Sequence, residues 1–494
     1  MEKIKNSEWV KSNQKKIKTI TNKLRPVLNE KIADITLVNL SLWFAKYNFE
    51  FSKKKFNNPL KVSKEKNWEN LVLKKRANTN VAQKIDEHLE EINKKSKSIK
   101  LWANFSNLFN KKDSDKSLRF VIDELNSNQV STFDDDEIKS DYRYIFNWIL
   151  NDFLQNSISS NKNFSYSNHL KNVVETCCFL AKKYFELNFK NHEKELKIYN
   201  PNLKFGSFFI DLSKQNIANE VSFYAQEAKK DDLYLASLNL LMNNVEYDDE
   251  KEINLFLTNK SSNVKSTLKE DQLKKLRKSV DFCITRLEDE NLSVYSNNEE
   301  WKNDVRWKNL PTSESSDVYY IYDILYKLNN NGFAFVVLKQ SFTTNKTAQQ
   351  ARKYLIENDL IEAVVKLPDE KESSNCLLIL NKNKNDNTKN KILFLDLDAL
   401  NIKKEKIWNN FYLKFLNNDS KNLKIKQNKE ILNSNGIKLD PTSTREQETD
   451  IENLSFEEKK EQYLKTISKL DSDLEDIMKQ LNEFKSSLKN PNEI

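Results

Sequence analysis

The sequence predicts an α/β protein with a helical N-terminal domain, a central domain built on a mostly parallel sheet, and a coiled-coil-like C-terminal helix. The first part follows from apolar residues that recur every three or four positions. The second follows from short β-branched runs that alternate with helical stretches between about 170 and 420. The third follows from a narrow apolar seam at 455–485. The 494 residues have room for about three domains, which we place at 1–155, 156–425 and 426–494.

The composition indicates a soluble protein that forms a core, because 38% of the residues are hydrophobic and 31% are charged. No apolar run reaches the roughly 20 residues that span a bilayer, and no signal peptide is recognisable, so we expect a cytoplasmic protein. The four cysteines include no Cys-x-x-Cys pair and there are only three histidines, so neither a disulfide framework nor a metal site is predicted. The net charge of +8 is compatible with a polyanionic partner but does not identify one.

The elements follow from periodicity. In the N-terminal domain, helices are expected at 17–28, 35–51 and 81–92. In the central domain, strands are expected at 197–199, 221–224, 253–257, 280–285, 333–338, 363–367, 376–381 and 392–397. Helices are expected between them at 213–219, 233–243, 318–328 and 348–357. The polar stretch 382–390 is expected to be a turn between two strands.

The C-terminal seam is a separate signal. Ser455 and Glu458 are expected to form a capping box at its start. So narrow a seam favours packing against a partner helix over packing within the chain. The apolar residues at heptad-like spacing are Phe456, Tyr463, Ile467, Leu470, Leu474, Ile477, Leu481 and Phe484.

One loop suggests a function. The strand at 196–199 runs into the loop 200–210, and a second apolar run ends in Tyr224-Ala225-Gln226-Glu227. This layout resembles the cofactor-binding start of adenine-specific DNA methyltransferases, in particular the modification subunit of type I restriction-modification systems, where the loop reads Asp-Pro-x-x-Gly-Ser-Gly. The resemblance implies S-adenosylmethionine as cofactor. The matching positions are Asn200, Pro201, Gly206, Ser207 and Glu227.

A longer resemblance to the same family covers 301–397. It includes Asp304-Val305-Arg306-Trp307, the helix around 317–321, Gly332-Phe333-Ala334, Arg352 to Leu355 and Ala363 to Pro368, in the family's order. It implies a Rossmann-like, seven-stranded methyltransferase sheet in which two late strands form a hairpin. Most of these residues build the sheet, so they indicate fold more than activity.

The cofactor loop departs from the family pattern. Family glycines let the backbone approach the cofactor, and the acid bonds the ribose hydroxyls. Here Asn200 replaces the loop aspartate, Lys204 and Phe205 occupy the glycine region, and only Gly206 is left. Since such a loop places Cβ atoms where the family has none, we expect cofactor binding to be impaired, with Glu227 as the remaining ligand.

The base site departs as well. The family holds a flipped adenine with an Asn-Pro-Pro-aromatic tetrad, whose oxygens accept hydrogen bonds from the adenine amine. The matching position reads Arg286-Leu287-Glu288-Asp289, in which arginine only donates and aspartate cannot stack on a base. A third element, Phe-Thr-Pro, is matched at best by Tyr166-Ser167-Asn168. No intact catalytic residue is therefore predicted.

These observations leave three hypotheses. The leading one is a modification-subunit-like protein with the adenine-N6 methyltransferase fold that has lost catalysis and acts as a structural or DNA-engaging subunit. Its implied partners are DNA, a DNA-specificity subunit and a restriction subunit. The first alternative is an active adenine-N6 methyltransferase subunit in which Glu227 still holds the ribose. The second is an interaction scaffold without DNA contact, assembled through the C-terminal helix.

Overall fold

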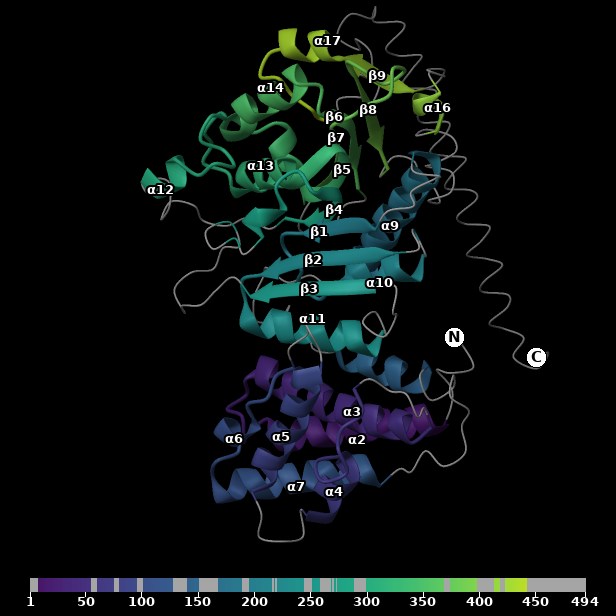
Figure 1. Cartoon of the computed structure of the whole chain (residues 1–494), viewed down its shortest axis with the longest axis vertical. Coiled ribbons are helices and arrows are strands. Elements are labelled where there is room, and N and C mark those ends of the chain that lie inside the picture. Colours follow the sequence, from purple (N-terminus) through teal and green to yellow (C-terminus); the bar gives the residue numbers. More distant parts are fainter. Residues whose placement is uncertain are drawn as a thin grey trace, which may run out of the picture. The chain divides into compact units, whose positions relative to one another are not determined.

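The computed structural model describes residues 8–441, with gaps at 55–59, 75–79, 96–100, 128–139, 151–167, 189–194, 216, 218–219, 244–250, 258–267, 269–270, 272, 288–298, 368–373, 398–412 and 418–422 (Figure 1). The predicted seam at 455–485, with its capping pair Ser455 and Glu458, lies outside these residues. Within the described ranges, no helix is both long enough and apolar enough to cross a membrane.

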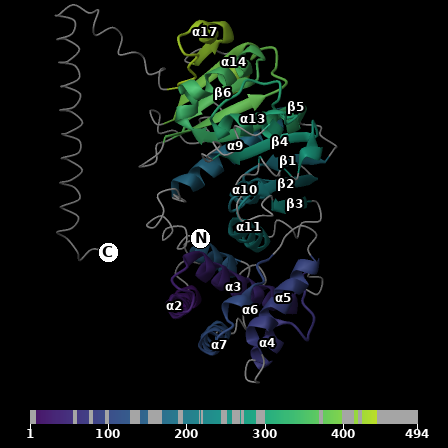
Figure 2. The same cartoon turned by 90° about the vertical axis from the view of Figure 1, so that its left-hand side faces the viewer.

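The N-terminal region is helical, as predicted. Its helices are α2 (Glu8–Leu24), α3 (Ile32–Lys54), α4 (Trp68–Lys74), α5 (Val81–Lys95), α6 (Phe105–Leu108) and α7 (Lys112–Asn126) (Figures 1 and 2). The apolar face of α2 is buried along its length, from Val10 through Ile17 to Leu24. Residues 140–150 add a further helical stretch, and Trp43 Nε1 of α3 donates to the carbonyl oxygen of Tyr142 at 3.0 Å. Apolar burial and this buried hydrogen bond hold helices that are distant in sequence together.

His88, on α5, is expected to make the stability of this region depend on pH. Its Nδ1 lies 2.8 Å from the carbonyl oxygen of Lys66, which can only accept, so Nδ1 carries a hydrogen. Burial lowers the pKa of His88 from 6.5 to about 4. The unfolded chain therefore binds the proton more readily, so stability is full above about pH 6.5 and falls as the pH decreases toward 4.

Urea unfolding at pH 7.5 and pH 5 measures this loss, which we expect to be about 2 kcal/mol from this one group. In His88→Gln the titrating ring is absent, so the difference between the two pH values should shrink by the same amount. An equal pH dependence in both proteins would assign the titration to other groups.

The central sheet has nine strands in the order β3-β2-β1-β4-β5-β7-β6-β8-β9. Strand β7 is antiparallel to both neighbours and β9 is antiparallel to β8, whereas the other pairs are parallel. The strands are β1 (Leu196–Asn200), β2 (Val221–Glu227), β3 (Lys251–Leu257), β4 (Val280–Arg286), β5 (Leu328–Lys339), β6 (Ile361–Lys366), β7 (Asn375–Asn381), β8 (Lys391–Asp396) and β9 (Lys424–Gln427).

This sheet confirms the predicted fold class and the late antiparallel pair, β6 and β7. It has two strands more than the seven that the family resemblance implies, and one more than the eight that periodicity predicts, because β9 extends the edge beyond β8. The sequence pattern missed β9, a four-residue strand with a single apolar residue, Ile425, between two lysines. Its alternation is too short to stand out.

Two apolar clusters cover the two faces of the sheet. On one face, Phe282 and Phe335 pack with α9 (Asn168–Asn188), α10 (Ser207–Lys214) and α11 (Lys230–Met242). On the other, Cys283 and Val336 pack with α13 (Ser316–Lys327) and α14 (Gln349–Glu357). Successive residues of each strand thus pack into the apolar clusters on opposite faces of the sheet. Figures 1 and 2 show the helices on both sides of the sheet.

The prediction for α10 was wrong. The sequence pattern predicted a loop that ends at residue 210 and a helix at 213–219, but the helix spans Ser207–Lys214. It begins early because Gly206 adopts a left-handed conformation, with φ at +70°, and is the N-cap residue. A side chain at Gly206 would be strained in this conformation, and its Cβ would lie 3.2 Å from Cγ of Leu240.

Candidate functional site

The predicted site residues meet at one edge of the sheet. Strands β1, β2 and β4 are mutually parallel, so their carboxyl ends lie side by side, at Asn200, Glu227 and Arg286. The carboxyl edge of a parallel sheet is where ligands bind in open α/β folds. The tertiary structure therefore brings together three positions that are distant in the sequence.

The loop after β1 is held by side chains at its base. Oδ1 of the buried Asn200 accepts a hydrogen bond from the backbone N–H of Asn202 at 3.0 Å. Nδ2 of Asn202 in turn donates to the carbonyl oxygen of Arg286 at 3.2 Å, which ties the loop to the end of β4. Pro201, between the two asparagines, is buried, and Ser207 is the first residue of α10.

Glu227 lies at the end of β2, where its carboxylate binds backbone N–H groups. Oε2 accepts from Lys204 at 2.9 Å, and Oε1 accepts from Ala228 at 2.9 Å and Lys229 at 3.0 Å. The residue is 1% exposed. Hydrogen bonds from backbone N–H groups to a carboxylate are charge-assisted and strong. Glu227 thus fastens the loop after β1 to the end of β2.

Two apolar side chains of the loop are buried in the core. Leu203 and Phe205 are buried in the apolar cluster that also contains α10 and α11. The carbonyl oxygen of Phe205 accepts from Nδ2 of Asn239 at 2.7 Å. Lys204, between them, has a φ of +49°, a left-handed conformation that costs free energy for a residue with a Cβ atom. The contacts of the two apolar residues and of Glu227 offset that strain.

The position that corresponds to the tetrad is only partly described. Arg286 ends β4 and is half-buried, and the buried Leu287 donates its backbone N–H to the carbonyl oxygen of Val337 at 2.8 Å. Leu287 is thereby fixed against β5. Glu288 and Asp289 lie outside the described residues, as do Tyr166 and Ser167, whereas Asn168 begins α9.

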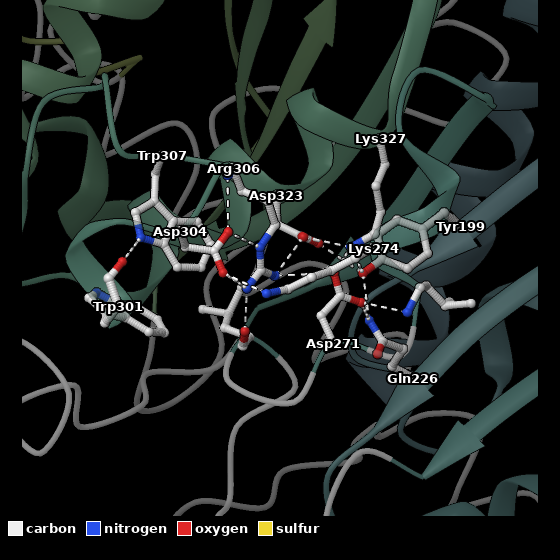
Figure 3. Close-up of polar contacts among 12 residues, drawn as sticks. Tyr199, Gln226, Asp271, Lys274, Trp301, Asp304, Arg306, Trp307, Asp323 and Lys327 are labelled. Carbon is white, nitrogen blue, oxygen red and sulfur yellow. Dashed lines mark hydrogen bonds and ion pairs between the residues drawn. The ribbon is translucent and has the colours of Figure 1, made fainter. Parts of the chain in front are cut away.

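An ion network lies on the opposite face of the same edge (Figure 3). At its centre, Nη1 of Arg306 lies 2.9 Å from Asp323 and 3.2 Å from Asp271. Nζ of Lys327 lies 2.6 Å from Asp323 and 2.7 Å from Asp271. These four side chains are at most 1% exposed. Two buried cations therefore alternate with two buried carboxylates.

The network reaches the surface through Asp304, which binds Arg306 Nε at 2.9 Å and the more exposed Lys274 at 2.8 Å. It reaches the strands through Tyr199 of β1 and Gln226 of β2. The Tyr199 hydroxyl donates to Asp323 at 2.9 Å, and Nε2 of Gln226 donates to Tyr199 at 3.0 Å and to Asp271 at 2.8 Å. Since Tyr199 and Gln226 directly precede Asn200 and Glu227, they point to the other face of the sheet.

Within this network the pKa values of Asp323 and Asp304 are lowered, whereas that of Asp271 is raised. Burial alone would raise the pKa of Asp323, but Lys327 and Arg306 lower it below its ordinary value. Burial likewise opposes ionisation of Asp304, whereas the hydrogen bonds and charge of Arg306 hold its pKa well below the usual range. Burial and the neighbouring Asp323 raise the pKa of Asp271. The four buried carboxylate and cationic groups compensate one another, which indicates a structural role.

The sequence pattern gave no sign that Asp271 or Lys327 is part of a site, and it marked Asp304 and Arg306 only as part of a family motif. One signal was available: Asp323 and Lys327 are four residues apart on the largely apolar helix α13. Such a pair stabilises a helix and, on a buried face, requires further charged partners.

In the described parts of the chain, no group of three or more His, Cys, Asp or Glu side chains is placed to hold a metal ion. The four cysteines are buried free thiols.

Known proteins resemble this chain over much of its length. The family model described as N-6 DNA Methylase matches residues 136–469. The HindI type I methylase subunit of Haemophilus influenzae is 25% identical over 232 residues, which cover 44% of this chain and 47% of that protein. The MjaVII type I methylase subunit of Methanocaldococcus jannaschii is 25% identical over 224 residues, covering 42% and 37%. This chain thus spans less than half the length of these curated relatives.

The fold has a solved counterpart. The crystal structure of a type I restriction-modification methyltransferase subunit from Streptococcus thermophilus superposes with a TM-score of 0.63. The match covers 88% of this chain and 99% of that one at 15% identity. At this identity the similarity establishes the fold.

Proposed function

This chain belongs to the N-6 DNA methylase family, and from that premise we propose that it is a type I modification-subunit-like protein that has lost methyl transfer. It acts as a structural or DNA-engaging subunit beside a DNA-specificity subunit and a restriction subunit. The family implies S-adenosylmethionine as the cofactor and duplex DNA as the substrate.

The bonding of Glu227 carries the proposal. A ribose-binding acid needs free acceptor sites toward the cofactor, but the Glu227 carboxylate receives three backbone N–H groups, out of about four sites in all. One of these comes from Lys204, within the loop that would have to admit the cofactor. S-adenosylmethionine therefore does not fit this arrangement unless that loop is rebuilt.

The loop interior gives a second argument. Leu203 and Phe205 are buried in the core, in the region where the family has glycines. Binding would have to displace these apolar side chains into water, which costs about 2 kcal/mol for each. At the neighbouring position, the Arg286 side chain has no acceptor atom for an adenine amine, and its carbonyl oxygen already accepts a hydrogen bond from Asn202. The described residues at both positions thus support a loss of methyl transfer.

Calorimetric titration of the full chain with S-adenosylmethionine tests the proposal. We expect no saturable heat up to millimolar cofactor, and no label transferred to adenine when the protein is incubated with labelled cofactor and duplex DNA. Saturable binding that Glu227→Ala abolishes and Glu220→Ala preserves would establish a working cofactor site instead. Glu220 is the matched control because it is an exposed glutamate directly before the same strand.

DNA engagement is tested separately, by measuring affinity for duplex DNA at several salt concentrations. A DNA-engaging subunit loses affinity steeply with salt, because phosphate contacts release counterions. Absence of any salt-dependent binding would favour the role of an interaction scaffold that does not contact DNA.

A further inference from the structure

Arg352, on α14, belongs to a motif that the proposed function leaves unused. Its side chain is fully buried, at 0% exposure, and donates four hydrogen bonds to backbone carbonyl groups. Two go to the turn after β5, to Phe342 at 2.8 Å and Asn345 at 2.7 Å. The other two go to Ile437 at 2.8 Å and Gly436 at 3.0 Å. One guanidinium thus bridges two segments that are about 90 residues apart.

Arg352 has no carboxylate partner among the described side chains. Burial lowers its pKa to about 10, so the group is still charged at neutral pH. A buried charge without a counterion is costly unless hydrogen bonds compensate it. Here the four carbonyl dipoles supply the compensation, so breaking either pair of bonds would leave a poorly solvated cation. This makes the two segments energetically dependent on each other.

Further contacts join the same two segments. The backbone N–H of Leu439 donates to the carbonyl oxygen of Thr343 at 2.9 Å, and Nε2 of Gln340 donates to Asp440 at 3.3 Å. Leu439 is itself fully buried. The segment 436–440 ends the first compact unit of the chain, Met1–Asp440.

The turn at residues 340–345 lies at the edge of the sheet that carries the candidate site. Strand β5 is parallel to β4 and ends at Lys339, so residues 340–345 follow at the same carboxyl edge as Asn200, Glu227 and Arg286. We propose that Arg352 is a coupling residue, which links the exit of the chain toward its C-terminal part to the edge of the sheet that carries the candidate site. Displacing either segment then loosens the other. This coupling does not depend on whether a cofactor binds.

Amide hydrogen exchange on the full-length protein tests the coupling. In Arg352→Met, the amides of both 340–345 and 436–440 should exchange at least about tenfold faster, because strong hydrogen bonds to a charged group are lost from each. Amides of β1, β2 and β4 should keep their protection. Arg25→Met is the matched control, because among the described residues the Arg25 side chain pairs only with the exposed Glu30, and it should leave both segments unchanged.

Leu439→Ala is the second variant, since it loosens one segment while leaving Arg352 in place. If the coupling holds, exchange rises in 340–345 as well as in 436–440. A rise confined to 436–440 would overturn the proposal, and so would unchanged exchange in either segment of Arg352→Met. If Arg352→Met unfolds the whole domain, the exchange measured in Leu439→Ala alone decides whether the two segments are coupled.

Discussion

Replacing Lys327 with methionine is expected to lower the free energy of unfolding by about 3–5 kcal/mol, the usual loss when one member of a buried ion pair is removed. Lys327 is 0% exposed and lies within 2.7 Å of both Asp271 and Asp323. Without its charge, three carboxylates share a single buried cation, Arg306. Equilibrium unfolding in urea, followed by circular dichroism, measures the change.

Lys274→Met is the matched control, because the substitution is the same and the lysine belongs to the same network. Its side chain is 48% exposed and, within the described ranges, pairs with Asp304 alone, so we expect a loss below about 1 kcal/mol. Equal losses in the two variants would show that burial does not determine the strength of these interactions. A small loss in Lys327→Met would indicate that water or a proton replaces the missing charge.

Replacing Glu227 with alanine is expected to lower the free energy of unfolding by about 3 kcal/mol, because three backbone N–H groups lose a charged acceptor together. The strained backbone of Lys204 also loses its support. Glu220→Ala, at an exposed position, should change stability by less than about 0.5 kcal/mol. Urea unfolding of the three proteins gives the comparison.

The effect of S-adenosylmethionine on the melting temperature distinguishes a structural role of Glu227 from a role in ligand binding. If Glu227 only fastens the loop, millimolar S-adenosylmethionine raises the melting temperature of neither the wild type nor Glu227→Ala. A ligand-dependent rise in the wild type that disappears in Glu227→Ala would contradict the proposed loss of cofactor binding.

Several elements were predictable because their signals are local. Strands such as β4 and β7 are short apolar runs between polar turns, and α13 and α14 show clear helical spacing. The bounds of α10 were not predictable in the same way, since they depend on a left-handed Gly206 packed against Leu240 of another helix. Strand β9 exists because β8 offers it an edge, and its four residues carry little pattern of their own.

By itself, the sequence determined the fold class, the order of most elements and the similarity to DNA methylases, because periodicity and motif order are properties of neighbouring residues. Only the tertiary structure decided what Glu227, Arg306 and Arg352 do. A carboxylate can hold a ligand or a loop, and a buried guanidinium can pair with acids or with carbonyl groups. The choice depends on which partners the fold brings within about 3 Å, and those partners are distant in the sequence.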